Sequence, residues 1–288
     1  MLVTLKEILA AAEKGGNYYD AAGGEKYAVG HFNMLNLEMA RGIIAAAEAE
    51  RSPLILGVAE VHFPFIPFEY AAPIMMQIAR EATVPVCLTL DHGTRYDCLC
   101  AAMKAGFSSV MFDGSALPYE ENIARTAEAA KVARALGVSV EAELGHVGQG
   151  AAGDGQDASL YTRVEQVNDF ITRSGADALA IAIGTAHGAY KAKPKLDIGR
   201  LDEIYAISKA PLVLHGGSGL TDEDFRTAIA HGIRKVNICT DMCVAEKNAQ
   251  LEGYAQGLSF EETVPLAVAA VQRVVEEKMR LFGSAGKA

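Results

Sequence analysis

The sequence lacks tryptophan, low-complexity tracts and any uninterrupted apolar run long enough to cross a bilayer. Its first residues do not combine a basic segment, an apolar segment and a cleavage site, so we expect no secretory signal and a cytoplasmic location. Basic residues are also few. The 26 Lys and Arg against 36 Asp and Glu give a formal net charge of −10, which disfavours nucleic acid and membranes as partners. A small phosphorylated substrate is still compatible with this charge, because helix N-termini or a metal ion supply local positive charge.

Cysteines are scarce and show no pairing pattern. There are 5, an odd number, and none forms a Cys-x-x-Cys motif. Together with the missing secretory signal, this predicts reduced thiols and disfavours a zinc site built on cysteine.

What the sequence does contain is a repeating alternation of short apolar runs with amphipathic segments, and half of its residues are hydrophobic. Eight strands separated by helices predict parallel pairing with helical crossovers. An open doubly wound sheet is the alternative, but the glycine pattern that it usually carries after the first strand is absent at residues 30–35. The predicted strands are Tyr27–Asn33, Leu54–Val58, Val84–Asp91, Phe107–Asp113, Val138–Glu143, Ala178–Ile183, Pro211–His215 and Arg234–Cys239.

We therefore expect an α/β protein, a (β/α)8 TIM barrel formed by a single domain, residues 1–288. An extra N-terminal helix would close the barrel floor. C-terminal helices at Asp241–Tyr254 and Phe260–Phe282 would cover the outside or meet a partner subunit. Thr4 with Glu7, and Thr162 with Glu165, have the spacing of helix capping boxes.

Polar residues gather where the predicted strands end, which is where barrels carry their functional groups. Three histidines beside a carboxylate, with room for a fourth ligand, are typical of a catalytic zinc site. We expect His31, His62 and His231 to be ordinary core or surface side chains. The residues at strand ends are Asn33, Asp91, His92, Asp113, Glu141, Glu143, His187, His215 and Asn237.

Two turns and one loop add to this pattern. His215–Gly219 and Asn237–Thr240 follow the seventh and eighth strands, the usual place for a phosphate site in a barrel. Gly145–Asp157 is rich in glycine, which is compatible with a flexible surface loop or with a lid over a substrate.

Seven motifs in sequence, from about residue 25 onward, resemble those of the class II, zinc-dependent ketose-bisphosphate aldolases, the family of the fructose- and tagatose-bisphosphate enzymes. They are Tyr-Ala-Val-Gly-His-Phe-Asn-Met-Leu-Asn (27–36), Leu-Asp-His-Gly (90–93), Met-Phe-Asp-Gly-Ser (111–115), Val-Glu-Ala-Glu-Leu-Gly (140–145), Ile-Gly-Thr-Ala-His-Gly-Ala-Tyr-Lys (183–191), Leu-Val-Leu-His-Gly-Gly-Ser-Gly (212–219) and Lys-Val-Asn-Ile-Cys-Thr-Asp (235–241).

The resemblance implies a role for each matching residue. His92, His187 and His215 would bind one Zn²⁺ per subunit, and Asp91 would be the proton donor and acceptor. Asp113 and Glu143 would lie at a second metal position, and a monovalent cation is a further candidate. The residues that would bind the phosphorylated substrate are Asn33, Gly188, Gly216, Gly217, Ser218, Asn237, Ile238, Cys239 and Thr240.

The implied reaction is the reversible cleavage of a ketose 1-phosphate or 1,6-bisphosphate to dihydroxyacetone phosphate and an aldehyde, by a homodimer or homotetramer. The zinc would stabilise the negative charge left by carbon–carbon cleavage. Alternatives are a tagatose-bisphosphate or other non-glycolytic aldolase, a Schiff-base aldolase using Lys191, Lys193 or Lys195, and a non-catalytic sugar-phosphate binding protein.

The sequence departs from the family at three places around the substrate. The loop 145–157 has no glutamate and only two acidic residues, Asp154 and Asp157. Ala59 replaces a frequent serine, and Thr89 replaces a frequent histidine. These departures leave the base for the donor proton and the identity of the aldehyde open.

Overall fold

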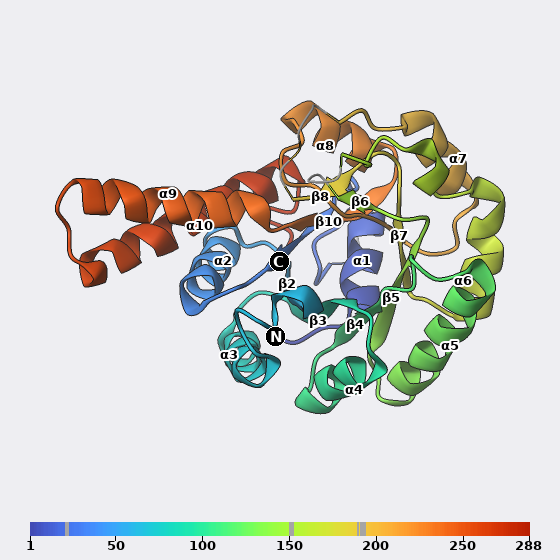
Figure 1. The fold of residues 1–288 in the computed structure, drawn as a ribbon, viewed down its shortest axis with the longest axis horizontal. Coiled ribbons are helices and arrows are strands. Elements are labelled where there is room, and N and C mark those ends of the chain that lie inside the picture. Colours follow the sequence, from blue (N-terminus) through green and yellow to red (C-terminus); the bar gives the residue numbers. More distant parts are fainter. Residues whose placement is uncertain (21–22, 150–152, 189, 191–193) are drawn as a thin grey trace.

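Eight parallel strands close into a barrel in the computed structural model, which describes residues 1–20, 23–149, 153–188, 190 and 194–288 (Figure 1). Neighbours around the barrel follow the order β1-β10-β9-β7-β5-β4-β3-β2. The predicted TIM barrel is thus confirmed. Its strands are β1 Val29–Asn33, β2 Leu54–Ala59, β3 Val86–Gly93, β4 Ser109–Phe112, β5 Ser139–Leu144, β7 Ala178–Ile181, β9 Leu212–Leu214 and β10 Ile233–Ile238.

Helices surround the barrel and bury the outer faces of its strands, which explains why the strands read as continuous apolar runs. The helices between strands are α2 Leu37–Glu50, α3 Phe68–Glu81, α4 Tyr96–Ala105, α5 Tyr119–Ala135, α6 Val167–Ser174, α7 Ile198–Ile207 and α8 Asp222–Ala230. Three short 3-10 helices accompany them: η1 Glu60–His62, η2 Ala158–Leu160 and η3 Val164–Gln166.

The N-terminal helix α1, Leu5–Lys14, closes one end of the barrel as the sequence predicts. The Thr4 side chain accepts the Glu7 N–H in the predicted capping box. Leu5, Ile8 and Leu9 are fully buried and pack with inward-facing residues of the strands in a second apolar cluster. Because this end is filled with apolar side chains, polar chemistry is confined to the opposite mouth.

The last two helices, α9 Thr240–Ala255 and α10 Phe260–Leu281, form an antiparallel pair that projects from the barrel (Figure 1). α10 packs against both α9 and α2. Val244, Leu251, Tyr254 and Phe260 leave apolar surface exposed on this pair. Within the described residues, none of the helices combines the length and the apolar character needed to span a membrane.

Two local features differ from the sequence prediction. A short parallel pair, β6 Gly148–Gln149 and β8 Ala186–His187, lies outside the barrel sheet and was not predicted. The capping box at Thr162 is wrong. Its hydroxyl donates to the Leu144 carbonyl and accepts the Ala182 N–H, and so it joins strand ends instead of starting a helix.

Candidate active site

A cavity of about 540 Å³ opens at the carboxyl ends of the barrel strands. It is lined by residues from the ends of β1, β2, β3, β5, β8 and β10, together with the segments that follow β2, β3, β4, β5, β8, β9 and β10. Most of the strand-end residues singled out from the sequence line it, including Asn33, Asp91, His92 and His187.

Asp91 and His92 are adjacent in sequence, and an unbroken strand would point them to opposite faces. The pairing of β3 with β4 shifts register between Leu90 and Gly93, and His92 has a positive φ of 47°. This break lets both side chains reach the cavity. A left-handed backbone at a residue other than glycine costs on the order of 1–3 kcal/mol, which the surrounding structure must offset.

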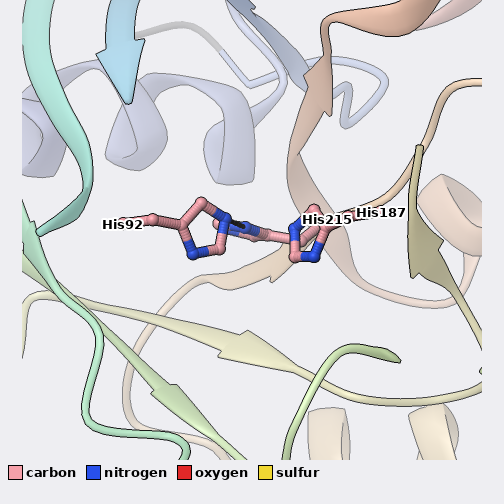
Figure 2. Close-up of side chains that lie close together, drawn as sticks. All are labelled: His92, His187 and His215. Carbon is pink, nitrogen blue, oxygen red and sulfur yellow. Dashed lines mark hydrogen bonds between the residues drawn. The ribbon is translucent and has the colours of Figure 1, made fainter. Parts of the chain in front are cut away.

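Three imidazoles converge in the cavity (Figure 2). The ring centre of His92 lies 4.6 Å from the ring centres of both His187 and His215, and the latter two are 5.8 Å apart. All three pairs meet edge-on. One nitrogen from each ring lies within 4.8 Å of the other two. His92 Nε2 is 2.8 Å from His215 Nδ1. The three residues come from β3, from β8 and from the turn after β9, so their proximity results from the fold alone.

The hydrogen bonds to the opposite ring nitrogens indicate which nitrogen faces the centre. His92 Nδ1 lies 2.7 Å from Asp113 Oδ2, and His215 Nε2 lies 2.8 Å from Glu141 Oε1. Since a carboxylate only accepts, both of these nitrogens carry the proton. His92 Nε2 and His215 Nδ1 then face each other, as two ligands of one cation would.

Glu141 is itself held by a buried cation. Lys235 Nζ donates to both Glu141 oxygens, at 2.8 and 2.7 Å, and both side chains are 1% exposed. Burial favours the neutral acid, but the Lys235 ammonium outweighs it and lowers the pKa of Glu141 to about 2. A continuous chain from Lys235 through Glu141 therefore orients the His215 ring.

Asp91 is held by two amides. Asn33 Nδ2 donates to Asp91 Oδ2 at 2.7 Å, and Asn237 Nδ2 lies 3.2 Å from Oδ1. His31 Nδ1 is 2.9 Å from Asn237 Oδ1 and orients that amide. Burial opposes ionisation of Asp91, but nearby His31 and His92 hold its pKa well below the usual range. The sequence predicts His31 as an ordinary core side chain and does not show that its ring orients Asn237. The ring sits above Gly57, where a Cβ would lie 1.9 Å from Nε2.

The charge balance and the unsatisfied groups of the cavity fit a metal cation. Burial disfavours a charged His92, yet the carboxylates of Asp91 and Asp113 raise its pKa to about 10. Burial and Asp113 together raise the pKa of Glu143 to about 8. Among the described residues, the buried His187 Nε2 and Glu143 Oε2 have no hydrogen-bond partner. Unpaired buried groups cost about 1–3 kcal/mol each, and a bound cation would remove that cost.

The glycine turn after β9 and the start of α9 form another wall of the cavity. Gly216 has a φ of 67°, and a Cβ there would lie 2.4 Å from the Ala186 carbonyl, so only glycine lets this turn pack against β8. The Ser218 hydroxyl lies 3.2 Å from the Cys239 N–H. Thr240 begins the 16-residue helix α9, whose dipole favours an anion at this end.

On the other side, the loop after β5 is joined to β8. Gly148 pairs with Ala186 and Gln149 pairs with His187 in parallel register. His146 of this loop lines the cavity, and its Nδ1 is 2.9 Å from Ser115 Oγ. This loop therefore contributes to the cavity wall, which favours the lid interpretation over a loose surface loop.

Comparisons with known proteins decide the family. The family described as fructose-bisphosphate aldolase class-II matches residues 6–287. The chain belongs to the class II fructose-bisphosphate aldolase family. It is 39% identical to a fructose-bisphosphate aldolase of Geobacillus stearothermophilus, over 100% of this chain and 99% of that protein. It is 41% identical to a 6-phospho-5-dehydro-2-deoxy-D-gluconate aldolase of Shouchella clausii, over 92% of both. The crystal structure of the YdjI aldolase from Escherichia coli K12 superposes with a TM-score of 0.87 at 37% identity, covering both chains fully.

As a class II aldolase, a lyase, the chain has most of its predicted site residues in one cavity. Gly188, Gly216, Gly217, Ser218, Asn237, Cys239 and Thr240 all line it, as do Asp113 and Glu143. Ile238 differs. Its side chain is fully buried in the apolar core and is not among the lining residues, because it alternates with Asn237 along β10 and points outward.

Several cavity residues of this aldolase escaped the sequence prediction. Glu60, His62 and Thr94 line the side nearest η1, and His62 was expected to be unremarkable. Their position after a strand end could have identified them, since η1 directly follows β2 and Thr94 directly follows β3. His146 is in the same position after β5. His231 behaves as expected, at the end of α8 with Nδ1 on Asp202.

Proposed function

We propose that this protein is a zinc-dependent aldolase that reversibly cleaves a ketose 1-phosphate or 1,6-bisphosphate to dihydroxyacetone phosphate and an aldehyde. The observation that carries the proposal is the convergence of His92, His187 and His215 beside Asp91, in a cavity whose wall includes the glycine turn and the start of α9. The family match supports the class of reaction.

In this proposal the three imidazoles hold one Zn²⁺, in keeping with the nitrogen-rich donor set. When bound, the ion supplies a Lewis acid that stabilises negative charge on the donor half of the sugar. Asp113 and Glu143 provide oxygen ligands for a second metal position, and a monovalent cation is a further candidate ion.

Asp91 moves the proton of the C4 hydroxyl, removing it during cleavage and returning it during condensation. Its low pKa keeps the carboxylate ionised and ready to accept. The two amides that hold it, from Asn33 and Asn237, set its direction toward the substrate.

The phosphate of the donor half binds at Gly188, Gly216, Gly217, Ser218 and Asn237–Thr240. The N–H groups at the start of α9 and the Ser218 hydroxyl suit an anion. For Ile238 only its backbone is suited to this role, because its side chain lies in the core.

We also propose that residues 1–288 fold as a single domain, that the protein is cytoplasmic and that it assembles as a homodimer or homotetramer. The exposed apolar residues of α9 and α10 support an assembly through this projecting pair.

Membership of the family does not by itself fix which sugar phosphate is the substrate. Two relatives are named for different sugar phosphates, a fructose bisphosphate and a 6-phospho-5-dehydro-2-deoxygluconate, so tagatose bisphosphate and other non-glycolytic substrates belong among the candidates. The Schiff-base alternative is less favoured. Lys195 is exposed, whereas a lysine that forms such adducts at neutral pH needs a lowered pKa. Lys191 and Lys193 lie outside the described residues.

The test is a panel of aldehydes incubated with dihydroxyacetone phosphate and the zinc-loaded enzyme, scored for new ketose 1-phosphates. We expect product with at least one aldehyde, loss of activity with a chelator, recovery with zinc, and no adduct trapped by borohydride. Full zinc occupancy with no turnover of any aldehyde would instead assign a non-catalytic sugar-phosphate binding protein.

A further inference from the structure

His146 is a titratable group of the cavity wall that the proposed function does not use. It follows the end of β5 by two residues and lines the cavity together with Glu143 and His187. It reaches this position on the loop whose strand β6 pairs with β8. An imidazole so placed is available for proton transfer to a bound substrate.

The hydrogen bonds of Ser115 indicate which nitrogen of His146 is basic. Ser115 Oγ lies 2.6 Å from Asp113 Oδ1, and this ionised carboxylate can only accept, so the single hydroxyl proton is donated there. Ser115 Oγ must then accept from His146 Nδ1, which lies 2.9 Å away. The neutral imidazole therefore carries its proton on Nδ1 and its lone pair on Nε2.

The same relay links His146 to the histidine cluster. Asp113 accepts from Ser115 through Oδ1 and from His92 through Oδ2, at 2.7 Å. Asp113 thus orients two imidazoles at once, one in the cluster and one on the loop. The distance between the proton-transfer group and the reacting carbons is set by this shared carboxylate.

Other acidic groups of the loop are engaged elsewhere. The Asp157 side chain is exposed and accepts from the N–H and the hydroxyl of Ser159, at 2.9 and 2.7 Å, at the start of η2. Asp154 Oδ1 lies against Gly148, 2.5 Å from the position of a Cβ there. The loop 145–157 contains no glutamate.

Resting on the proposed function, we propose that His146 is the catalytic residue that moves the carbon-bound proton of the donor substrate. In condensation, Nε2 takes a proton from the hydroxymethyl carbon of dihydroxyacetone phosphate, which is C3 in the numbering of the ketose. The C–H bond breaks, an N–H bond forms, and the released electron pair forms the enediolate while the carbonyl pair moves to oxygen. In cleavage, the same N–H returns its proton to C3, and the neutral imidazole is restored.

Glu143 is the competing group. Its Oε1 accepts the Val147 N–H at 2.9 Å, and its Oε2 is buried without a partner in the described residues. We assign Oε2 to the cation, because a buried carboxylate beside Asp113 and His92 forms one of the three possible ligand clusters. Among the titratable groups of β5 and of the loop that follows it, this assignment leaves His146 as the proton carrier.

The experiment isolates the proton transfer from carbon–carbon chemistry. Zinc-loaded enzyme is incubated with dihydroxyacetone phosphate in D₂O without aldehyde, and NMR follows the loss of the C3 hydrogen signal. The variants are His146→Gln, His146→Ala and Glu143→Gln. The matched control is His231→Gln, which removes another histidine whose Nδ1 meets an oxygen, far from the cavity on α8.

We expect His146→Gln to slow the exchange by about 10²–10⁴-fold, the usual range for losing an acid–base group, with unchanged zinc content. Added imidazole should restore part of the exchange in His146→Ala, and His231→Gln should behave as wild type.

Unchanged exchange in His146→Gln would overturn the proposal, as would loss of its zinc. Exchange abolished by Glu143→Gln but retained in His146→Gln would assign the step to Glu143 instead. These outcomes leave the proposed function standing. The proposed function fails separately if the wild-type enzyme neither exchanges the C3 hydrogen nor forms product with any aldehyde.

Discussion

The two sides of the cavity are built differently. On the barrel side, Asp91, His92 and His215 are each oriented by a polar neighbour, and behind His215 the chain of contacts runs on through Glu141 to Lys235. On the loop side, His146 and His187 depend on a parallel pair of two-residue strands. The barrel side is suited to hold a metal ion and a carboxylate in place. The loop side is suited to parts that must adjust when a substrate arrives.

This difference explains why residues at strand ends and residues on loops have different functions in a barrel. A residue at a strand end is held rigidly by the closed sheet, so a metal-binding side chain there needs little further ordering. A loop residue needs a second tether, which for His146 is Ser115 and for His187 is the pairing with Gln149. Variants of the three imidazole ligands and variants of His146 alone should therefore separate metal binding from proton transfer.

The largest effect is expected from His187→Ala, because it removes one of three ligands. Outer contacts of metal ligands contribute about 10–100-fold to metal affinity, so loss of a ligand itself should exceed that range. Zinc content measured by mass spectrometry should fall together with activity, while the circular dichroism spectrum stays that of the folded chain. A zinc-free preparation with full turnover would contradict the assignment.

Asp91→Ala separates proton transfer from metal binding among the residues at strand ends. Since Asp91 carries the hydroxyl proton and not the metal, cleavage should slow by about 10²–10⁴-fold while zinc stays bound. Steady-state cleavage rates and metal analysis, run on the same sample, check both parts. An unchanged cleavage rate would remove Asp91 from the mechanism.

Lys235→Met tests the chain of contacts behind His215. It leaves Glu141 buried without its cationic partner, and removing one partner of a buried ion pair costs about 3–5 kcal/mol of unfolding free energy. Zinc affinity should fall by about 10–100-fold because His215 loses its orientation. Chemical denaturation and zinc titration measure the two effects.

A paired control separates stability from orientation in that experiment. Adding Glu141→Gln to Lys235→Met removes both charges, so most of the lost stability should return. Zinc affinity should stay low, since a neutral amide is a weaker acceptor for His215. Recovery of both together would show that the pair acts only on stability.

The smallest effect is expected from Gly155→Ala, on the loop side. The added methyl group would lie 2.8 Å from the Ala186 Cβ, so the loop must shift by a few tenths of an ångström. A misplacement of 1 Å costs about 10²-fold in rate, so proton exchange should fall by clearly less than that. Zinc content should not change, and a change there would mean that the two sides are not separable.

The sequence predicts the barrel well because its signals are local and repeated. Each strand is an apolar run, and the capping box at Thr4 fits a helix whose apolar face fills the barrel floor. The capping box at Thr162 fails for the opposite reason, since a tertiary contact with Leu144 and Ala182 takes its hydroxyl. The pair β6–β8 escapes prediction because two-residue strands leave no periodic pattern.

Strand ends also identify most of the candidate site, whereas partners inside the barrel do not show in the sequence. Lys235 lies within the last barrel strand, and only the closed sheet reveals that it faces Glu141. His31 gives no signal either, because its contact with Asn237 joins the first strand to the last. His146 follows the end of β5, but it lies in a glycine-rich loop with no periodic pattern that would place its side chain in the cavity.

X-ray absorption at the zinc edge tests the central claim most directly, namely that three imidazoles hold one zinc ion in this cavity. The account predicts a first shell of about three nitrogen ligands at roughly 2.0–2.1 Å, which decreases when His187 is replaced. A sulfur ligand at about 2.3 Å, which Cys239 at the cavity wall would supply, or a shell without imidazole scattering would contradict it.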